Sequence, residues 1–157
     1  MTMDANTFQN ISGEGMRFGI VRARFNEDIT GNMLASCEKT LRKAGAAQID
    51  TVIVPGSVEI PYALQELGKR ADYDALIALG CIIKGGTPHF ELISKMVHDG
   101  LLRLALDLRT PVIAGVITCF DRGQALERAG DGPLNRGVEA AHAALEMADL
   151  RKERGWK

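Results

Sequence analysis

The sequence has few cysteines, little net charge and no long apolar run, and each shortage argues against a class of protein. Its three cysteines, Cys37, Cys81 and Cys119, are odd in number and widely spaced, whereas a disulfide framework or a metal knuckle needs paired or closely spaced cysteines. A net charge of -1 without blocks of like charge gives no reason to expect a nucleic acid or an anionic membrane as partner. We therefore expect a reduced, cytoplasmic protein without a bound metal.

The chain also lacks the apolar segments of membrane or exported proteins. Its apolar runs are strand-sized, well short of the ~20 residues that span a bilayer. The first fifteen residues, MTMDANTFQNISGEG, have neither the basic nor the apolar region of a signal peptide. With 157 residues and 46% hydrophobic residues, the composition fits one globular domain with a real core. We expect an N-terminal segment over 1–15 and a single domain over 16–157, without repeats or linkers.

Strand-like and helix-like segments alternate along this domain. The expected strands are Met16–Ala23, Ile49–Val54, Ala75–Ile83 and Pro111–Cys119. The expected helices are Glu27–Ala44, Val58–Lys69, His89–Leu108, Arg122–Ala129 and Asn135–Arg151. Such alternation predicts a three-layer αβα sandwich around a parallel four-stranded sheet, a flavodoxin-like fold. Ligands of such sheets bind at the carboxyl ends of the strands, so the turns after Ala23, Val54, Ile83 and Cys119 are the candidate site.

The long helix His89–Leu108 has apolar residues on two sides. The first stripe consists of Phe90, Ile93, Val97, Leu101, Leu104 and Leu108, and the second of Leu92, Met96, Leu102 and Leu106. One sheet covers only one side of a helix. The pattern is either a single broad face or a helix buried on both sides, and we favour burial of the second stripe against another subunit.

The turn Lys84-Gly85-Gly86-Thr87-Pro88-His89 follows the most apolar strand. Thr87 is a good N-cap, and Pro88 would then occupy the first helical position. The glycines let the backbone approach a ligand, and the free N–H groups of the first helical turn favour an anion. An ordinary tight turn would explain GGTP equally well. His89 favours a catalytic site instead, because the helix dipole is expected to keep the imidazole neutral, as a general base requires.

The other turns are less specific. Phe25 and Asn26 follow the first strand, where packing and capping are the common roles. Glu59, in the turn after Val54, either binds a ligand or interacts with the helix dipole. Asp121 and Gln124 resemble a capping box, and Arg128 in the last turn of that helix is either favoured by the dipole or a phosphate ligand.

Taken in order, these turns resemble the lumazine synthase family over about residues 16–150. The matching strings are ARFN (23–26), VPGSVEIP (54–61), ALGCIIKGGTPHFE (78–91) and QALERAG (124–130), followed by NRGVEAA and ALEMA. GGTPHF after an apolar strand, combined with ERAG and then N-R-G, is specific; ARFN alone is not.

The resemblance implies a transferase that joins 5-amino-6-(D-ribitylamino)uracil to 3,4-dihydroxy-2-butanone 4-phosphate, giving 6,7-dimethyl-8-ribityllumazine and phosphate without a cofactor, the penultimate step of riboflavin biosynthesis. It implies that Phe25 stacks on the pyrimidine, that His89 moves protons, and that phosphate is held by Gly86, Thr87 and Arg128. The other substrate-binding positions that it implies are Asn26, Gly56, Ser57, Val58, Glu59, Cys81, Ile82, Ile83, Ala114 and Arg136.

The family also implies a homopentamer whose subunits share their active sites. Arg128 and the 114 region would reach the pocket of a neighbouring subunit, and the segment around Thr7–Ile11 would pair with a neighbour's sheet. The pentamers would close further into an icosahedral shell. Riboflavin synthase is a candidate partner. The family usually has arginine at 84, alanine at 57, lysine at 136 and phenylalanine at 114, where this chain has Lys84, Ser57, Arg136 and Ala114. Because Ala114 removes an aromatic from the pocket, a non-catalytic flavin- or lumazine-binding relative is the alternative.

Overall fold

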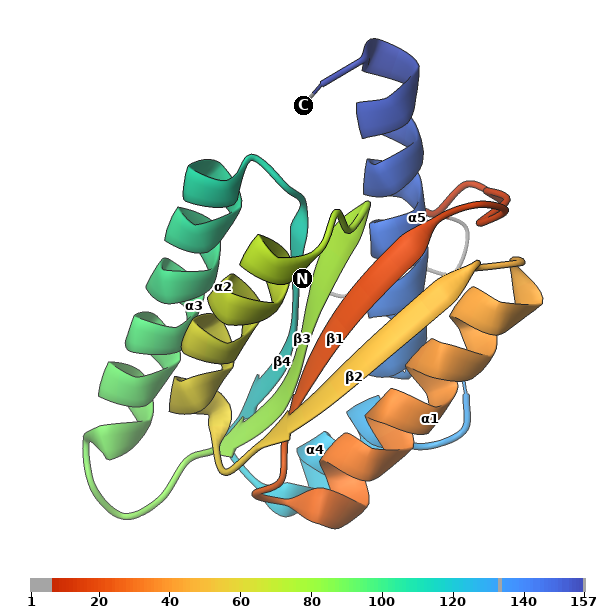
Figure 1. The fold of residues 1–157 in the computed structure, drawn as a ribbon. Coiled ribbons are helices and arrows are strands. Elements are labelled where there is room, and N and C mark those ends of the chain that lie inside the picture. Colours follow the sequence, from red (N-terminus) through yellow and green to blue (C-terminus); the bar gives the residue numbers. More distant parts are fainter. Residues whose placement is uncertain (1–6, 133, 157) are drawn as a thin grey trace.

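The computed structural model describes residues 7–132 and 134–156, and its centre is a four-stranded parallel sheet (Figure 1). The strands are β1 (Arg17–Ala23), β2 (Gln48–Val54), β3 (Ala75–Ile83) and β4 (Val112–Cys119), in the order β2-β1-β3-β4. The sequence prediction of a parallel four-stranded sheet is confirmed, and the order is that of the flavodoxin-like fold without its fifth strand.

Helices cover both faces of the sheet. They are α1 (Glu27–Lys43), α2 (Ile60–Arg70), α3 (His89–Leu108), α4 (Arg122–Ala129) and α5 (Arg136–Arg154), with a 3-10 turn η1 (Ser57–Glu59) before α2. Figure 1 shows α2 and α3 on one face and α1, α4 and α5 on the other. The predicted three-layer sandwich is therefore confirmed.

Two cores result, one on each side of the sheet, because successive strand residues point to opposite faces. Ile20 of β1 belongs to the core under α1, α4 and α5, and its neighbour Val21 to the core under α2 and α3. Strand β3 is buried along its length up to Ile82. Its continuous apolar run is thus the signature of a strand covered on both faces.

Most element boundaries agree with the sequence to within two or three residues. Among the helix starts, the largest difference is at α2, which we expected to begin at Val58 and which begins at Ile60 after the 3-10 turn. The cause is local: Glu59 Oε2 accepts a hydrogen bond from the Gly56 N–H at 2.9 Å. This bond closes a tight 3-10 turn, so the α-helix begins two residues later than expected.

The second stripe of α3 is uncovered in the single chain. Val97, Leu101 and Leu104 of the first stripe are almost fully buried against the sheet. Every residue of the second stripe is exposed, and Leu102 and Leu106 have exposed fractions of 64% and 70%. The two stripes are therefore separate faces, and the second has no partner within the described part of this chain.

The described part of the N-terminal segment lies against α5 and the end of α1. The Phe8 ring stacks on His142 at a centroid distance of 5.9 Å, and the Gly13 N–H donates to the Ala44 carbonyl at 2.7 Å. Residues 1–6 fall outside the described residues, and pairing of 7–11 with a neighbouring sheet stays a prediction. Within the described residues, no helix is long and apolar enough to cross a membrane.

Candidate active site

A pocket of about 290 Å³ opens at the carboxyl end of the sheet, on the face covered by α2 and α3. Strand β2 lies on one side of β1 and β3 on the other, so the winding reverses between β1 and β3 and leaves a crevice outside their ends. The pocket is lined by Phe25, Gly56, Ser57, Val58, Glu59, Cys81, Ile82, Ile83, Gly85, Thr87, His89, Phe90 and Ile93. The fold thus gathers three of the predicted turns around one cavity.

The turn after β1 presents an aromatic ring at the mouth of this pocket. Its backbone is fixed by two hydrogen bonds, from the Arg24 N–H to the Val54 carbonyl at 2.7 Å and from the Phe25 N–H to the Pro55 carbonyl at 3.0 Å. The Phe25 side chain is 71% exposed, so its ring is held in place without being buried. Such a ring offers a flat apolar surface to a planar ligand.

Asn26 does not line the pocket but supports its floor. Its backbone is left-handed, with φ 61° and ψ 51°, and it is the N-cap of α1. Its side-chain Nδ2 donates to the Cys81 carbonyl at 3.2 Å. The Asn26 amide therefore connects the turn after β1 to the end of β3. The sequence had instead suggested that this side chain contacts the substrate.

The turn after β2 places a carboxylate at the opposite wall. Glu59 is exposed, and one of its oxygens is occupied by the Gly56 N–H. Ser57 is almost buried, and a Cβ on Gly80 of β3 would lie only 2.6 Å from the Ser57 Oγ. The absence of a side chain at Gly80 therefore allows β3 and the 3-10 turn to approach each other closely.

The end of β3 supplies the floor. Cys81 and Ile82 are almost fully buried, so what they offer a ligand is mainly backbone. Burial, together with the neighbouring Cys119 thiol, raises the pKa of Cys81 to about 12, and burial also raises the pKa of Cys119. Both thiols stay protonated near neutral pH, which makes Cys81 a wall of the pocket rather than a nucleophile.

The glycine-rich turn after β3 brings Gly85, Thr87 and His89 to the pocket, whereas Gly86 does not line it. The predicted N-cap is wrong: Pro88 caps α3 and His89 is the first helical residue. Pro88 has turn geometry, with φ -70° and ψ 6°, so the helix begins one residue later than Thr87 would allow. No side chain of the described residues caps this helix, so the N–H groups of its first turn remain available to an anion.

Three predicted residues lie elsewhere in the chain. Arg128 and Arg136 line a second hollow of about 400 Å³ along the free edge of β4, and Ala114 and Arg136 line a smaller one of about 150 Å³. Asp121 caps α4 by accepting from the Gln124 N–H, as expected, but the Gln124 side chain binds the Phe120 N–H instead of completing a capping box.

Phe120 lies between the pocket and the second hollow. It lines the hollow with Arg128, its ring centroid is 6.3 Å from that of Phe90, and the Lys84 Nζ lies 5.6 Å from its centroid. Ala114 pairs with Ala78 near the start of β4, whereas Phe120 follows the end of this strand. Within this chain, the Phe120 ring therefore does not replace the aromatic side chain that the family usually has at position 114.

A sequence model of the family 6,7-dimethyl-8-ribityllumazine synthase matches residues 15–152. The chain belongs to this family. It is 45% identical over 152 residues to the 6,7-dimethyl-8-ribityllumazine synthase of Acidovorax ebreus, with 96% of each chain covered, and 44% identical over 144 residues to that of Aquifex aeolicus, covering 90% of this chain and 94% of the relative.

A relative from Thermococcus gammatolerans with the same name is 43% identical over 141 residues, covering 90% of this chain and 91% of the relative. Among solved structures, a GDP-L-fucose synthetase from Naegleria fowleri matches at a TM-score of 0.39 and 12% identity, over 96% of this chain and 51% of that one.

Sequence analysis of this lumazine synthase family member missed three lining residues: Gly85, Phe90 and Ile93. Gly85 and Phe90 belong to the GGTPHF string, so the motif itself was the signal for them. Ile93 follows Phe90 by about one helical turn on the first stripe of α3. Because this stripe faces the sheet, its first residues also face the cavity at the end of the sheet.

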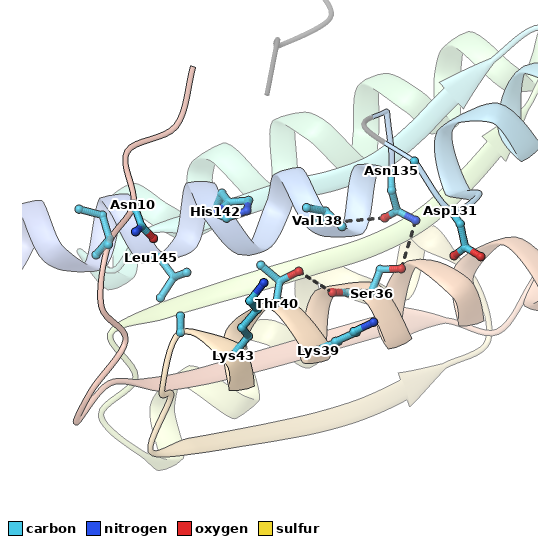
Figure 2. Close-up of a pocket in the computed structure, with 13 residues that line it drawn as sticks. Asn10, Ser36, Lys39, Thr40, Lys43, Asp131, Asn135, Val138, His142 and Leu145 are labelled. Carbon is cyan, nitrogen blue, oxygen red and sulfur yellow. Dashed lines mark hydrogen bonds between the residues drawn. The ribbon is translucent and has the colours of Figure 1, made fainter. Parts of the chain in front are cut away.

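A larger cavity, of about 590 Å³, lies between α1 and α5 (Figure 2). None of the predicted site residues lines it. Its Asn135 is already engaged: Nδ2 donates to the Ser36 Oγ at 3.2 Å and Oδ1 accepts from the Val138 N–H at 3.1 Å. The 290 Å³ pocket remains the candidate active site, because it lies at the strand ends and contains most of the predicted site residues, whereas the larger cavity contains none.

Proposed function

We propose that this chain condenses 5-amino-6-(D-ribitylamino)uracil with 3,4-dihydroxy-2-butanone 4-phosphate to give 6,7-dimethyl-8-ribityllumazine and phosphate, as a transferase of riboflavin biosynthesis. The observation that carries the proposal is the pocket at the ends of β1 and β3, where Phe25, Glu59 and His89 meet. Membership of the lumazine synthase family gives the reaction.

Each wall of the pocket suits one part of the substrates. The exposed Phe25 ring stacks on the pyrimidine, the backbone at Cys81–Ile83 meets its polar edge, and Glu59 accepts hydrogen bonds from ribityl hydroxyls. The uncapped first turn of α3, with Gly86 and Thr87, receives the phosphate.

The chemistry then needs positioning and proton transfer. The amine of the pyrimidine adds to the ketone, and loss of water gives an imine. Loss of a carbon-bound proton and departure of phosphate give an enol, and the ring closes with loss of a second water. His89 accepts the proton as phosphate leaves, a role that its place beside Thr87 and the helix start supports. These steps use no redox group and no metal.

The site also needs a second copy of the chain. Arg128, Arg136 and Ala114 line hollows on the β4 edge, not the pocket with Phe25, so we propose that they complete the pocket of a neighbour. The uncovered stripe of α3 gives that neighbour an apolar surface. We propose a homopentamer, closing further into an icosahedral shell, with riboflavin synthase as a candidate partner. Three buried free cysteines support a reducing, cytoplasmic setting.

Turnover of the two substrates, followed by formation of the lumazine, tests the activity. Binding of the lumazine without turnover would instead favour a non-catalytic flavin- or lumazine-binding relative. Light scattering tests the assembly: we expect pentamers or multiples of five, and Leu106→Glu, on the uncovered stripe, should reduce both assembly and activity. Fully active monomers would contradict the shared site.

A further inference from the structure

Arg22 breaks the apolar pattern of a strand that is covered on both faces. Its neighbours on the same face of β1, Phe18 and Ile20, are fully buried core residues. The Arg22 residue is itself only 5% exposed, so its guanidinium lies inside the core under α1. Burying a charge is costly unless it is paired and hydrogen-bonded. The partners of the Arg22 guanidinium therefore indicate what this side chain stabilises.

Those contacts all go to the first turn of α1. The Nη1 donates to the Thr30 Oγ1 at 3.2 Å, and the Nη2 pairs with the Glu27 Oε1 at 3.4 Å. Glu27 is the first residue of α1 and Thr30 the fourth, so the guanidinium holds both ends of one helical turn. The Nε is buried and has no hydrogen-bond partner among the described residues.

From this turn the contacts lead to the active site. The Thr30 hydroxyl donates to the Asn26 carbonyl at 3.3 Å, and the Asn26 amide donates to the Cys81 carbonyl on the pocket floor at 3.2 Å. Asn26 has a left-handed backbone with φ 61°, which asparagine tolerates better than most residues other than glycine, and its side-chain bond to Cys81 holds it in this turn. Phe25 is its direct neighbour, so the position of the ring depends on this backbone.

We propose that Arg22 is a positioning residue of this site, fixing the turn after β1 so that Phe25 and Asn26 are ready for the pyrimidine. The inference rests on the proposed function in one respect, that the pyrimidine stacks on Phe25. Arg22 touches no substrate and acts through Thr30 and Asn26.

Stability alone does not account for an arginine here. A buried ion pair replaced by apolar residues of similar volume often leaves a protein equally or more stable. The Glu27 side chain is 67% exposed, so this pair is only half desolvated. A cation is also disfavoured at the start of a helix, where the dipole is positive. A costly charge next to a binding site points to a role in the site.

Arg22→Met tests this, because methionine keeps an unbranched side chain and removes the charge and the donors. The ligands are 6,7-dimethyl-8-ribityllumazine, for the pyrimidine side, and inorganic phosphate, for the α3 side. We expect the Kd of the lumazine to rise about 5- to 30-fold, which converts to about 1–2 kcal/mol at 1.4 kcal/mol per factor of ten. The Kd of phosphate should stay within about twofold, since no link of the network reaches α3, and Tm should not fall.

Companion variants separate positioning from a general effect. Thr30→Val should reproduce the loss, and the double variant should bind no worse than either single variant, because both break one network. Arg22→Lys keeps the charge but cannot bridge both partners, so its lumazine Kd should be intermediate. Arg17→Met, at the far end of β1, is the control and should leave both Kd values unchanged.

Unchanged lumazine binding in Arg22→Met would overturn the proposal. So would parallel weakening of both ligands with a lower Tm, which is the result expected of a merely structural residue. Failure of the proposed function is distinguishable, because it appears in the wild-type protein, which would then form no lumazine from the two substrates. Additive losses in the double variant would show that Arg22 and Thr30 act separately, which also contradicts the network.

Discussion

Replacing Phe25 by alanine separates binding from folding unusually well. The ring is 71% exposed, so only about three tenths of it is packed in the free chain. A phenylalanine covers about 150–250 Å², which leaves about 60 Å² already buried. At about 25 cal/mol per Å² the cost to folding is at most roughly 1.5 kcal/mol. The backbone hydrogen bonds that hold the turn do not involve the side chain, so Phe25→Ala should fold and assemble.

The expected loss lies in ligand binding. Stacking of a base-like ring on an aromatic side chain contributes roughly 1–3 kcal/mol by alanine substitution. Phe25→Ala should therefore raise KM for the ribitylaminouracil about 5- to 150-fold. KM for the butanone phosphate should change little, because we propose that its phosphate binds at the start of α3, on the other side of the pocket.

Steady-state kinetics with each substrate varied in turn measures both constants. Trp156→Ala, a control at the exposed end of the chain, also removes a largely exposed aromatic ring and should change neither. Equal increases in both KM values would mean that Phe25 shapes the whole pocket, and an unchanged KM for the pyrimidine would refute stacking on this ring.

Three further predictions concern Arg128, His89 and the buried thiols. Arg128→Ala should weaken the butanone phosphate by roughly 1.5–3 kcal/mol, about 10- to 150-fold, through loss of a charge-assisted contact; equal weakening of the pyrimidine would make Arg128 structural. His89→Gln should lower turnover by ~10²–10⁴-fold, and by less if bringing the substrates together supplies most of the acceleration; full activity across pH 6–8 would exclude acid–base chemistry by His89. Burial raises the pKa of Cys37 and Cys81 from 9.0 to about 12, so these thiols contribute full stability below pH 9 and lose it as the pH rises toward 12. Urea midpoints measured from pH 7 to pH 10.5 should therefore fall above pH 9, and rapid reaction of the native thiols with a thiol reagent at pH 8 would contradict their burial.

The fold was predictable because its signals are local and repeated. The run ALIALGCII gives a strand buried on both faces, and the spacing of Ile29, Met33, Cys37 and Leu41 gives the buried face of α1. Once the strands alternate with helices, a parallel sheet and the location of its binding edge follow. The exact start of a helix was less predictable, because it depends on single bonds such as that between Glu59 and Gly56.

The site was predictable only in part, because some of its features exist only in three dimensions. The motifs placed Phe25, Glu59 and His89 at strand ends, and the structure joins them in one pocket. The left-handed Asn26 and its bond to Cys81 depend on the neighbouring strand, 55 residues away in sequence. Arg22 stands in a strand-like run, MRFGIVRA, and nothing in one sequence distinguishes a buried arginine from one that faces solvent.

The separation of Arg128 from the Phe25 pocket has a genetic consequence, complementation between mutant alleles. A chain that carries Phe25→Ala still presents a sound Arg128 edge, and a chain that carries Arg128→Ala still presents a sound pocket. In the proposed ring each active site draws its two halves from different chains. Two alleles that are each impaired would then complement one another when expressed together, since about one quarter of the sites in an evenly mixed ring would combine both sound halves.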